Sequence, residues 1–577
     1  MCRLCSLGMF RSHRGSRRNF LKGAAAAGIA ASGGLNLFAP RPAAAQLANY
    51  SDPPQNSGAP GSRYVIRGGA VMSMDPAVGD FAQADVLVEG KTILAVRPNI
   101  AAGNADVIDA TGRIVMPGFV DTHHHQFETA LRSFLADGVL INDQTGSDSG
   151  STTYFEFILL TFAPVYRPED VYINELFGGL SQLDDGVTTV HDVSQIHYSP
   201  DHSDAAVQAL FDTGRRAAFG YFEGAGQGII PSPPGYAYPQ DAYRLHDKYF
   251  RSTDQLVTMI MGGEVYIGQP TYTKAWSIGR DIGIPVAAHI LSPFGIRPIL
   301  DALADGTAGN NTITGKPLKI GPDNLFIHMT GMSDKGWDAV HKNGAQVSIA
   351  FPIEMNMRHG TPPIIRMQTM SKPQHPFEPS LSVDVECTLT ADFFTQMRSA
   401  MNLQRMIVNQ MILDSPNTDP GENLPNPLDW GLPEAAAQVS GGTFPPYWPT
   451  AKSKPAIPKK IPDPLTTRDV LRYATMNGAK ALRLDDKVGS LTPGKEADII
   501  LLDATRLNVA PLNQVPGAVV SLMDRTNVET VIVAGKVRKW KGQLLGVDLD
   551  GLRKTLELSR DHIFQTAGIP QNLFSPQ

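Results

Sequence analysis

Three consecutive histidines, His123, His124 and His125, follow an apolar run at residues 114–120. Such a run is typical of a strand buried on both faces, so the histidines fall where the strand stops and a loop begins. Successive side chains of a strand point to opposite sides, so His123 and His125 face one way and His124 the other. Two imidazoles on one side can bind one metal ion, which makes the motif half of a metal site; a surface histidine cluster is the alternative.

Further runs of the buried-strand type alternate with helical stretches along the middle of the chain. They cover residues 186–192, 216–221, 256–261, 284–289, 325–328 and 345–350. Strand and helix repeated this often predict a parallel sheet, and the length suits a closed eightfold barrel. Short alternating segments near both ends, at 64–67, 85–90, 497–502 and 528–536, predict a small β domain. The expected fold class is α/β, a TIM (β/α)8 barrel with a small β-sandwich domain built from both chain ends.

We divide the chain accordingly into five parts. These are a leader at 1–45, the first part of the small β domain at 62–118, the barrel at 119–485, the second part of the β domain at 486–545, and a C-terminal helical tail at 546–577. Two stretches break the alternation: residues 134–155 are rich in Gly, Ser, Thr and Asp, and residues 415–465 are rich in Pro. Long loops of this kind are either active-site lids or plain surface excursions.

The leader has the pattern of a twin-arginine signal. The residues SRRNFLK at 16–22 precede a weakly apolar stretch at 23–39 and the small residues Ala43, Ala44 and Ala45. This pattern predicts cleavage after Ala45 and a periplasmic or secreted location. The stretch is short and glycine-rich against the roughly 20 apolar residues that a membrane span needs, so we expect no stable membrane anchor.

Charge and cysteine usage narrow the class of partner. The formal net charge is -6, and loss of the leader with its seven basic residues makes it -13. A chain with this much negative charge is a poor partner for nucleic acid, and we therefore expect a small-molecule substrate. The same features are compatible with a homo-oligomer. Two of the three cysteines lie in the leader, and the remaining Cys387 cannot form a disulfide framework.

Several motifs occur in an order that resembles the amidohydrolase superfamily. They are VMPGFVDTHHH at 115–125, His289 and His328 at the ends of later strands, Asp384 after residues 379–383, and VGSLTPGKEAD at 488–498. Within that superfamily the chain is most similar to the branch that holds cytosine deaminase, S-adenosylhomocysteine deaminase and the triazine hydrolases. The likeness covers roughly residues 62–545.

The resemblance implies a set of site residues. His123, His125, His289 and Asp384 would bind one divalent metal ion, zinc or iron, with a position left open for water. His328 would stand beside the metal and bond the substrate or hydroxide. Asp384 would also take the proton from the water and pass it to the leaving group.

A binuclear site, as in many relatives, would need a carboxylated lysine at the end of the fourth strand. Residues 259–264 contain no lysine, so a single ion is expected. His191 and His359 are candidates for substrate binding, although a structural role for His191 is about as plausible. The methionines of the same region could form an apolar, adaptable pocket wall: Met355, Met357, Met367 and Met370.

The chain departs from the family at one functional position. Deaminases of this branch carry a glutamate three residues after the fifth-strand histidine, where it passes a proton to a ring nitrogen. The residue at that position is Ser292, which cannot do this at neutral pH. Glu354 could supply the missing carboxylate from another strand; a salt bridge from Glu354 to Arg358 is the alternative.

Together these observations predict an exported, single-metal hydrolase that cleaves a carbon–nitrogen bond of a small cyclic or aromatic compound, by deamination or amide hydrolysis. A metal-dependent lyase or decarboxylase on the same barrel and a non-catalytic binding protein are the alternatives. The complete set of three histidines and one aspartate argues against a binding protein, because such a buried cluster is costly without its ion.

Overall fold

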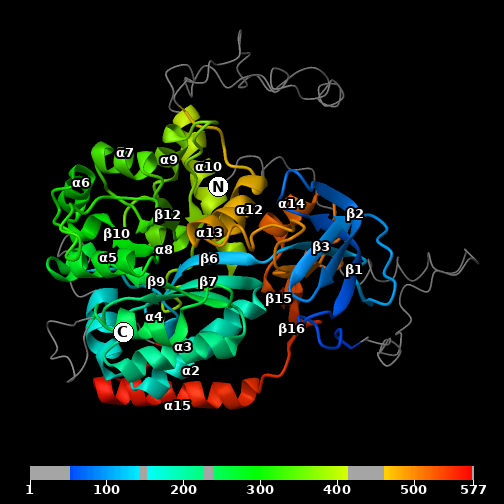
Figure 1. The fold of residues 1–577 in the computed structure, drawn as a ribbon, viewed down its shortest axis with the longest axis horizontal. Helices are drawn as coiled ribbons and strands as arrows, with labels where there is room; N and C mark the ends of the chain where they lie inside the picture. The colour runs from blue at the N-terminus through cyan, green and yellow to red at the C-terminus, as the bar shows by residue number, and fades with distance from the viewer. Residues whose placement is uncertain (1–51, 142–151, 225–237, 414–460, 575–577) are drawn as a thin grey trace, which may run out of the picture. The chain divides into compact units, whose positions relative to one another are not determined.

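The computed structural model describes residues 52–141, 152–224, 238–413 and 461–574 (Figure 1). The expected leader at 1–45, most of the 415–465 insertion and the centre of the 134–155 stretch lie outside these ranges. Within them, no helix combines the length and the apolar character needed to cross a membrane.

One of the two sheets is the predicted barrel. Its eight strands are parallel, and each pairs with the next along the chain. The apolar runs picked out in the sequence correspond to six of them, and β8 has the expected bounds. The strands are β6 (Phe119–His124), β7 (Val187–Ser194), β8 (Arg216–Tyr221), β9 (Val257–Gly262), β10 (Val286–Ile290), β11 (Asn324–His328), β12 (Gln346–Ile349) and β13 (Ser380–Leu381).

Helices lie between and after these strands, as a barrel of βα units requires. Between β6 and β12 they are α2 (Pro168–Asp184), α3 (Pro200–Thr213), α4 (Ala242–Tyr249), α5 (Thr271–Asp281), α6 (Arg297–Asp305) and α7 (Asp334–Lys342). After β12 come α8 (Phe351–Asn356), α9 (Ile364–Met370), α10 (Phe393–Leu413), α12 (Thr467–Ala474), α13 (Met476–Ala481) and α15 (Leu549–Ala567). Figure 1 shows α15 beside α2, against which it packs.

The barrel closes where its first and last strands meet, at the histidine motif. The backbone N–H of Asp384 donates to the carbonyl of His123 at 2.9 Å, and the N–H of His125 donates to the carbonyl of Asp384 at 2.8 Å. These bonds continue the short strand β13, which contains only two residues, onto β6. We call this junction the seam.

The apolar run at 114–120 forms two strands, and our prediction of a single strand was wrong. β5 (Arg113–Pro117) belongs to the sheet of the small β domain and β6 to the barrel, with Gly118 between them. A Cβ atom on Gly118 would lie 2.2 Å from Cγ2 of Thr188, so a side chain there would clash with the neighbouring strand. The second of these strands, β6, includes His123 and His124, and His125 is the first residue after it.

The sheet of the small β domain joins the two ends of the chain, which confirms the predicted architecture. Its central strand order is β14, β5, β1, so C-terminal and N-terminal strands are direct neighbours. β1 is parallel to β4 and β5, and the other pairs are antiparallel. The nine strands are β1 (Arg63–Met72), β2 (Asp80–Glu89), β3 (Thr92–Arg97), β4 (Asp106–Asp109), β5, β14 (Ile499–Asp503), β15 (Val528–Val533), β16 (Lys536–Trp540) and β17 (Gln543–Leu544).

A buried ion pair connects the barrel to this sheet. Arg216, the first residue of β8, has a side chain that is 1% exposed. Its Nε donates to Asp498 Oδ2 at 3.1 Å, and its Nη2 donates to Glu496 Oε2 at 2.6 Å. Because these carboxylates have little access to water, the positive guanidinium is needed to compensate their negative charge.

We expect Arg216→Ala to lower the free energy of unfolding by about 3–5 kcal/mol, because it leaves the buried Asp498 carboxylate without its cation. Urea denaturation of the full chain measures the change. Arg63→Ala is the control: Arg63 and Glu89 form an ion pair whose side chains are both 43% exposed, and its loss should cost less than about 1 kcal/mol. Equal effects of the two substitutions would contradict a structural role for the Arg216 pair.

Candidate metal centre

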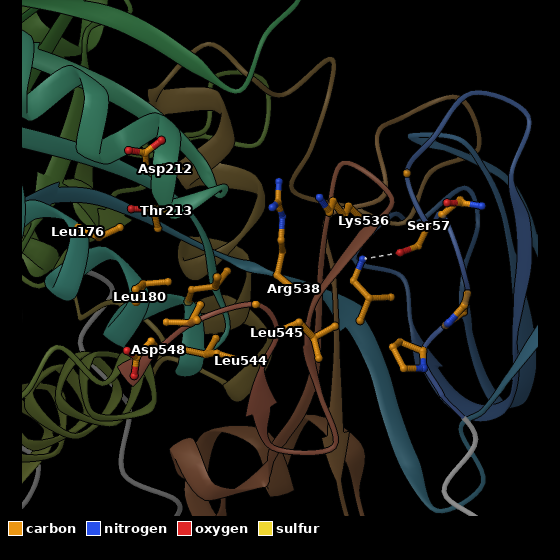
Figure 2. Close-up of a pocket in the computed structure, with 18 of the residues that line it drawn as sticks. Ser57, Leu176, Leu180, Asp212, Thr213, Lys536, Arg538, Leu544, Leu545 and Asp548 are labelled. Carbon is orange, nitrogen blue, oxygen red and sulfur yellow. Dashed lines mark hydrogen bonds between the residues drawn. The ribbon is translucent and has the colours of Figure 1, made fainter. Parts of the chain in front are cut away.

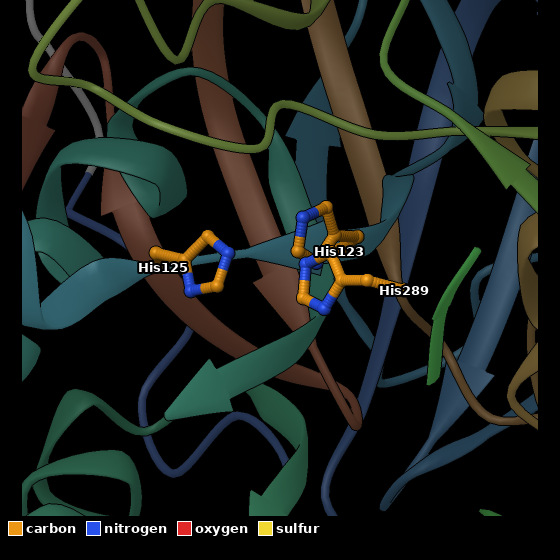
Figure 3. Close-up of side chains that lie close together, drawn as sticks. All are labelled: His123, His125 and His289. Carbon is orange, nitrogen blue, oxygen red and sulfur yellow. The ribbon is translucent and has the colours of Figure 1, made fainter. Parts of the chain in front are cut away.

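His123, His125 and His289 lie together at the carboxyl ends of the first and fifth barrel strands (Figure 3). The ring centroid of His123 lies 4.7 Å from that of His125 and 4.8 Å from that of His289. One nitrogen from each ring falls within 4.8 Å of the others, which is close enough for a shared ion. We call these residues the imidazole cluster.

The electrostatics of the imidazole cluster fit a divalent ion. All three side chains are buried. Burial, reinforced by the neighbouring imidazoles, holds the pKa of His123 and of His125 well below the ordinary value. These rings are therefore neutral at pH 7 and offer lone pairs, and Nδ1 of His123 has no hydrogen-bond partner among the described residues. In His289, burial is outweighed by the neighbouring Glu264 carboxylate, which raises the pKa above its ordinary value. Buried imidazoles in such a group are the donor set that zinc prefers.

Asp384 lies between the imidazole cluster and His328. Its Oδ1 is 3.1 Å from Nε2 of His123, and its Oδ2 is 3.5 Å from Nε2 of His328. Oδ2 is buried and has no hydrogen-bond partner within the described ranges. The φ angle of Asp384 is +74°, a left-handed conformation that is costly for a residue other than glycine. A strained backbone that carries an unpartnered carboxylate oxygen indicates a functional position.

Two groups outside the cluster orient its rings. Nδ1 of His289 donates to Glu264 Oε1 at 2.5 Å, and the backbone N–H of His289 donates to Glu264 Oε2 at 3.0 Å. Nδ1 of His125 donates to the carbonyl of Val193 at 2.8 Å. Partners of this kind turn the opposite nitrogen, Nε2, toward a metal. Glu264 was not among the predicted site residues, although a carboxylate just after the fourth strand was a usable signal.

His124 and His191 lie outside the imidazole cluster. His124 points away from it, with Nε2 3.8 Å from Glu386 Oε2, as strand alternation predicts. Nδ1 of His191 donates to the carbonyl of Thr122 at 3.0 Å, so this ring contacts the backbone of β6. Burial lowers the pKa of His124 to about 3 and that of His191 to about 4, which keeps both rings neutral.

Glu354 forms a hydrogen bond with His328. Its Oε1 lies 3.0 Å from Nδ1 of His328 and accepts the backbone N–H of Ala350 at 3.1 Å. Its Oε2 is buried and has no partner in the described part of the chain. Burial raises the pKa of Glu354 well above the ordinary value. The helix α8 thus places the carboxyl group of Glu354 on one side of the His328 ring, and Asp384 lies on the other.

His359 faces the same region from the loop after α8. Its Nε2 is 3.9 Å from Asp384 Oδ2, and its ring centroid is 4.8 Å from that of His328. His359, Glu354, Ser292 and Met355 line a cavity of about 790 Å³. We call it the site cavity, because two of its lining residues, Glu354 and His359, contact His328.

A larger cavity, of about 1090 Å³, lies elsewhere, between α2 and the β16–β17 hairpin (Figure 2). Leu176, Leu180, Arg538 and Leu544 are among its lining residues. None of the histidines or carboxylates described above lines it, so size alone does not locate the chemistry of this protein.

Comparisons with known proteins agree with this geometry. Residues 457–538 match the family model "Amidohydrolase family". A 5'-deoxyadenosine deaminase of Methanosarcina acetivorans is 24% identical over 479 residues, which cover 82% of this chain and 92% of that protein. A 5-methylthioadenosine/S-adenosylhomocysteine deaminase of Pelotomaculum thermopropionicum is 26% identical over 512 residues, covering 84% of this chain and 95% of that protein.

Solved structures show the same fold. An adenosine deaminase from Xanthomonas campestris with bound zinc superposes with a TM-score of 0.63 at 20% identity, covering 88% of this chain and 100% of that one. A mutant of the atrazine chlorohydrolase TrzN from Arthrobacter aurescens, in complex with zinc and atraton, gives a TM-score of 0.64 at 18% identity, with coverages of 86% and 100%.

Fold and residue set together define a TIM barrel with an appended β domain and a group of buried side chains that could hold a metal ion. The comparisons confirm the resemblance to the amidohydrolase superfamily, in the branch of S-adenosylhomocysteine deaminase and the triazine hydrolases. The chain is accordingly similar to amidohydrolase-type enzymes, and the named relatives are deaminases of small, non-peptide compounds.

The opposite orientations of His125 and His124 lead to a direct test. We expect His125→Ala to lose the metal ion that the imidazole cluster would hold, whereas His124→Ala keeps the wild-type metal content, because His124 points away. Elemental analysis of the untagged, purified variants measures the bound metal, and circular dichroism checks that both are folded. Loss of metal from the His124 variant alone would show that the strand register is wrong.

Proposed function

We propose that this protein is an exported, metal-dependent hydrolase that uses water to cleave a carbon–nitrogen bond of a small cyclic or aromatic compound. The observation that carries the proposal is the convergence of the imidazole cluster and Asp384 at the carboxyl ends of the barrel strands, where barrel enzymes build their active sites. The deaminase names of the relatives support hydrolysis at such a bond. The twin-arginine pattern at 16–22 supports a periplasmic or secreted location.

His123, His125, His289 and Asp384 would hold one divalent ion, and the zinc in both structural neighbours favours zinc over iron. Three imidazoles and one carboxylate leave room for a water molecule in the coordination shell. A divalent ion bound there polarises the substrate and makes that water acidic enough to attack near neutral pH.

Asp384 and His328 handle the proton and the substrate. Asp384 Oδ2 receives no hydrogen bond from the described residues, so its lone pairs are free to take the proton of the attacking water. The same oxygen can then return this proton to the leaving group. Nε2 of His328 lies 3.5 Å away, and the bond from Nδ1 to Glu354 fixes the ring so that Nε2 faces the reacting atoms.

Glu354 takes the place of the glutamate that is absent at Ser292. Burial raises the pKa of Glu354 well above the ordinary value, which favours the protonated form of its carboxyl group. Oε1 already accepts two hydrogen bonds, so a proton on this group would sit on the unpartnered Oε2. A neutral carboxyl group in a cavity wall can donate to a ring nitrogen of the substrate, which is the task of the missing glutamate.

Release of ammonia tests the proposed reaction. The zinc-loaded enzyme is incubated with 5'-deoxyadenosine, 5-methylthioadenosine, S-adenosylhomocysteine, adenosine and atraton, the compounds named for its relatives, and with simple ring amides. We expect loss of at least one aminated compound with equimolar ammonia, and no turnover after metal removal by a chelator. Release of carbon dioxide without ammonia would instead support a decarboxylase.

The role of Glu354 is tested by replacing its carboxyl group with an amide. Glu354→Gln should lower kcat by about 10²–10⁴-fold, the usual contribution of a general acid, while the metal content stays unchanged. Glu169→Gln is the matched control, because the Glu169 side chain is 64% exposed in a surface ion pair and should be turnover-neutral. Near-normal turnover of the Glu354 variant would remove Glu354 from the mechanism.

A further inference from the structure

The site cavity continues into a second, apolar cavity. This second cavity measures about 390 Å³ and shares Thr361, Pro362 and Ile407 with the site cavity. Its other walls are mostly apolar and come from the end of β11, from α7 and from α9. We call it the apolar groove; besides the shared residues it is lined by Met329, Gly331, Met332, Asp334, Trp337, Pro363, Ile365 and Arg366.

The backbone connects the apolar groove to the reacting centre at one point. His328 and Met329 are consecutive, with φ angles of +71° and +56°, so two neighbouring non-glycine residues have left-handed conformations. Through this strained turn, His328 contacts Asp384 on one side while Met329 lines the apolar groove on the other. Such strain is maintained where a structure must place side chains for function.

The chemistry of the groove suits an uncharged, apolar group. Its two charged lining residues, Asp334 and Arg366, pair with each other at 2.8 Å, and the Asp334 side chain is 87% exposed at the rim. Methionines recur along the path: Met329 and Met332 line the groove, and Met406 lines the site cavity and is 61% exposed. Methionine side chains adapt to ligands of different shape.

We propose that the substrate of this enzyme carries an apolar arm several carbon atoms long, which lies in the apolar groove while the reacting ring occupies the site cavity. This inference rests on the proposed function only in placing the reacting group beside the metal. The apolar groove alone is within the size range of ligand pockets, so a bare ring would leave it unfilled. Ile407, on α10, contacts both compartments and is the residue over which the arm would pass.

The probes are 1-methylimidazole, 1-butylimidazole and 1-hexylimidazole, whose ring nitrogen binds zinc and whose alkyl chain varies. Calorimetry on the zinc-loaded full chain measures the Kd of each. For every methylene that enters the apolar groove we expect the Kd to fall about fourfold, so the hexyl compound should bind more than tenfold tighter than the butyl compound.

Two variants locate the effect. Ile365→Asn and Met332→Asn should each flatten the dependence of Kd on chain length and leave binding of 1-methylimidazole unchanged, because both side chains are partly exposed and line the apolar groove but not the site cavity. Leu558→Asn, a change at a leucine that is 70% exposed on α15, should keep the wild-type dependence.

The two measurements distinguish a failure of the metal-site proposal from a failure of the apolar-groove proposal. Binding of 1-methylimidazole reports on the metal site, and the gain with chain length reports on the groove. Absence of that gain in the wild-type enzyme overturns the groove proposal whether or not 1-methylimidazole binds. The same holds if both groove variants keep the full gain, since the alkyl chain would then lie elsewhere.

Discussion

The whole site depends on how the barrel closes. β13 has only two residues, so few contacts join it to β6. The backbone hydrogen bonds of Asp384 with His123 and His125 extend this contact beyond the end of β13. Below these bonds the hydroxyl of Thr122 lies 2.7 Å from that of Ser348 and 2.9 Å from that of Ser380, so polar contacts also hold the interior of the seam. The same bonds that close the fold therefore set the separation between Asp384 and the first two histidines.

Buried charge is the second constraint on this site. Asp384, Glu264 and Glu354 are all buried among imidazoles, and burial lowers the pKa of three of these rings, His123, His125 and His328. Carboxylates in such surroundings are costly unless they are paired, hydrogen-bonded or protonated. Glu264 is satisfied by two hydrogen bonds from His289, and burial favours the protonated form of Glu354, which leaves Asp384 as the group that gains most from a divalent cation.

Much of this arrangement could be predicted from the sequence because it follows from local patterns. Apolar runs located the barrel strands, and strand alternation placed His123 and His125 on one side, with His124 on the other. The break at Gly118 was missed because the apolar run continues across it, although Pro117 and Gly118 together are a turn signal.

Contacts between distant strands could not be predicted in the same way. The hydrogen bond between Glu354 and His328 joins α8 to the end of β11, and the positions of these two residues along the sequence do not show that Glu354 faces the ring. Likewise the methionines that line the groove, Met329 and Met332, were not among those the sequence suggested, since cavity walls depend on how loops pack. Of the methionines that were suggested, Met355 does line the site cavity.

The union of both chain ends in one sheet has a consequence for biosynthesis. Met116 of β5 pairs with Ile500 of β14, about 380 residues later in the chain. At ordinary rates of translation, the ribosome needs roughly 20–80 s to make that interval. During this time one edge of β5 exposes backbone groups that can pair with another chain, next to the strand that carries the metal ligands. Because Asp498, the partner of Arg216, also belongs to the late segment, the nascent barrel lacks this buried ion pair until translation is nearly complete.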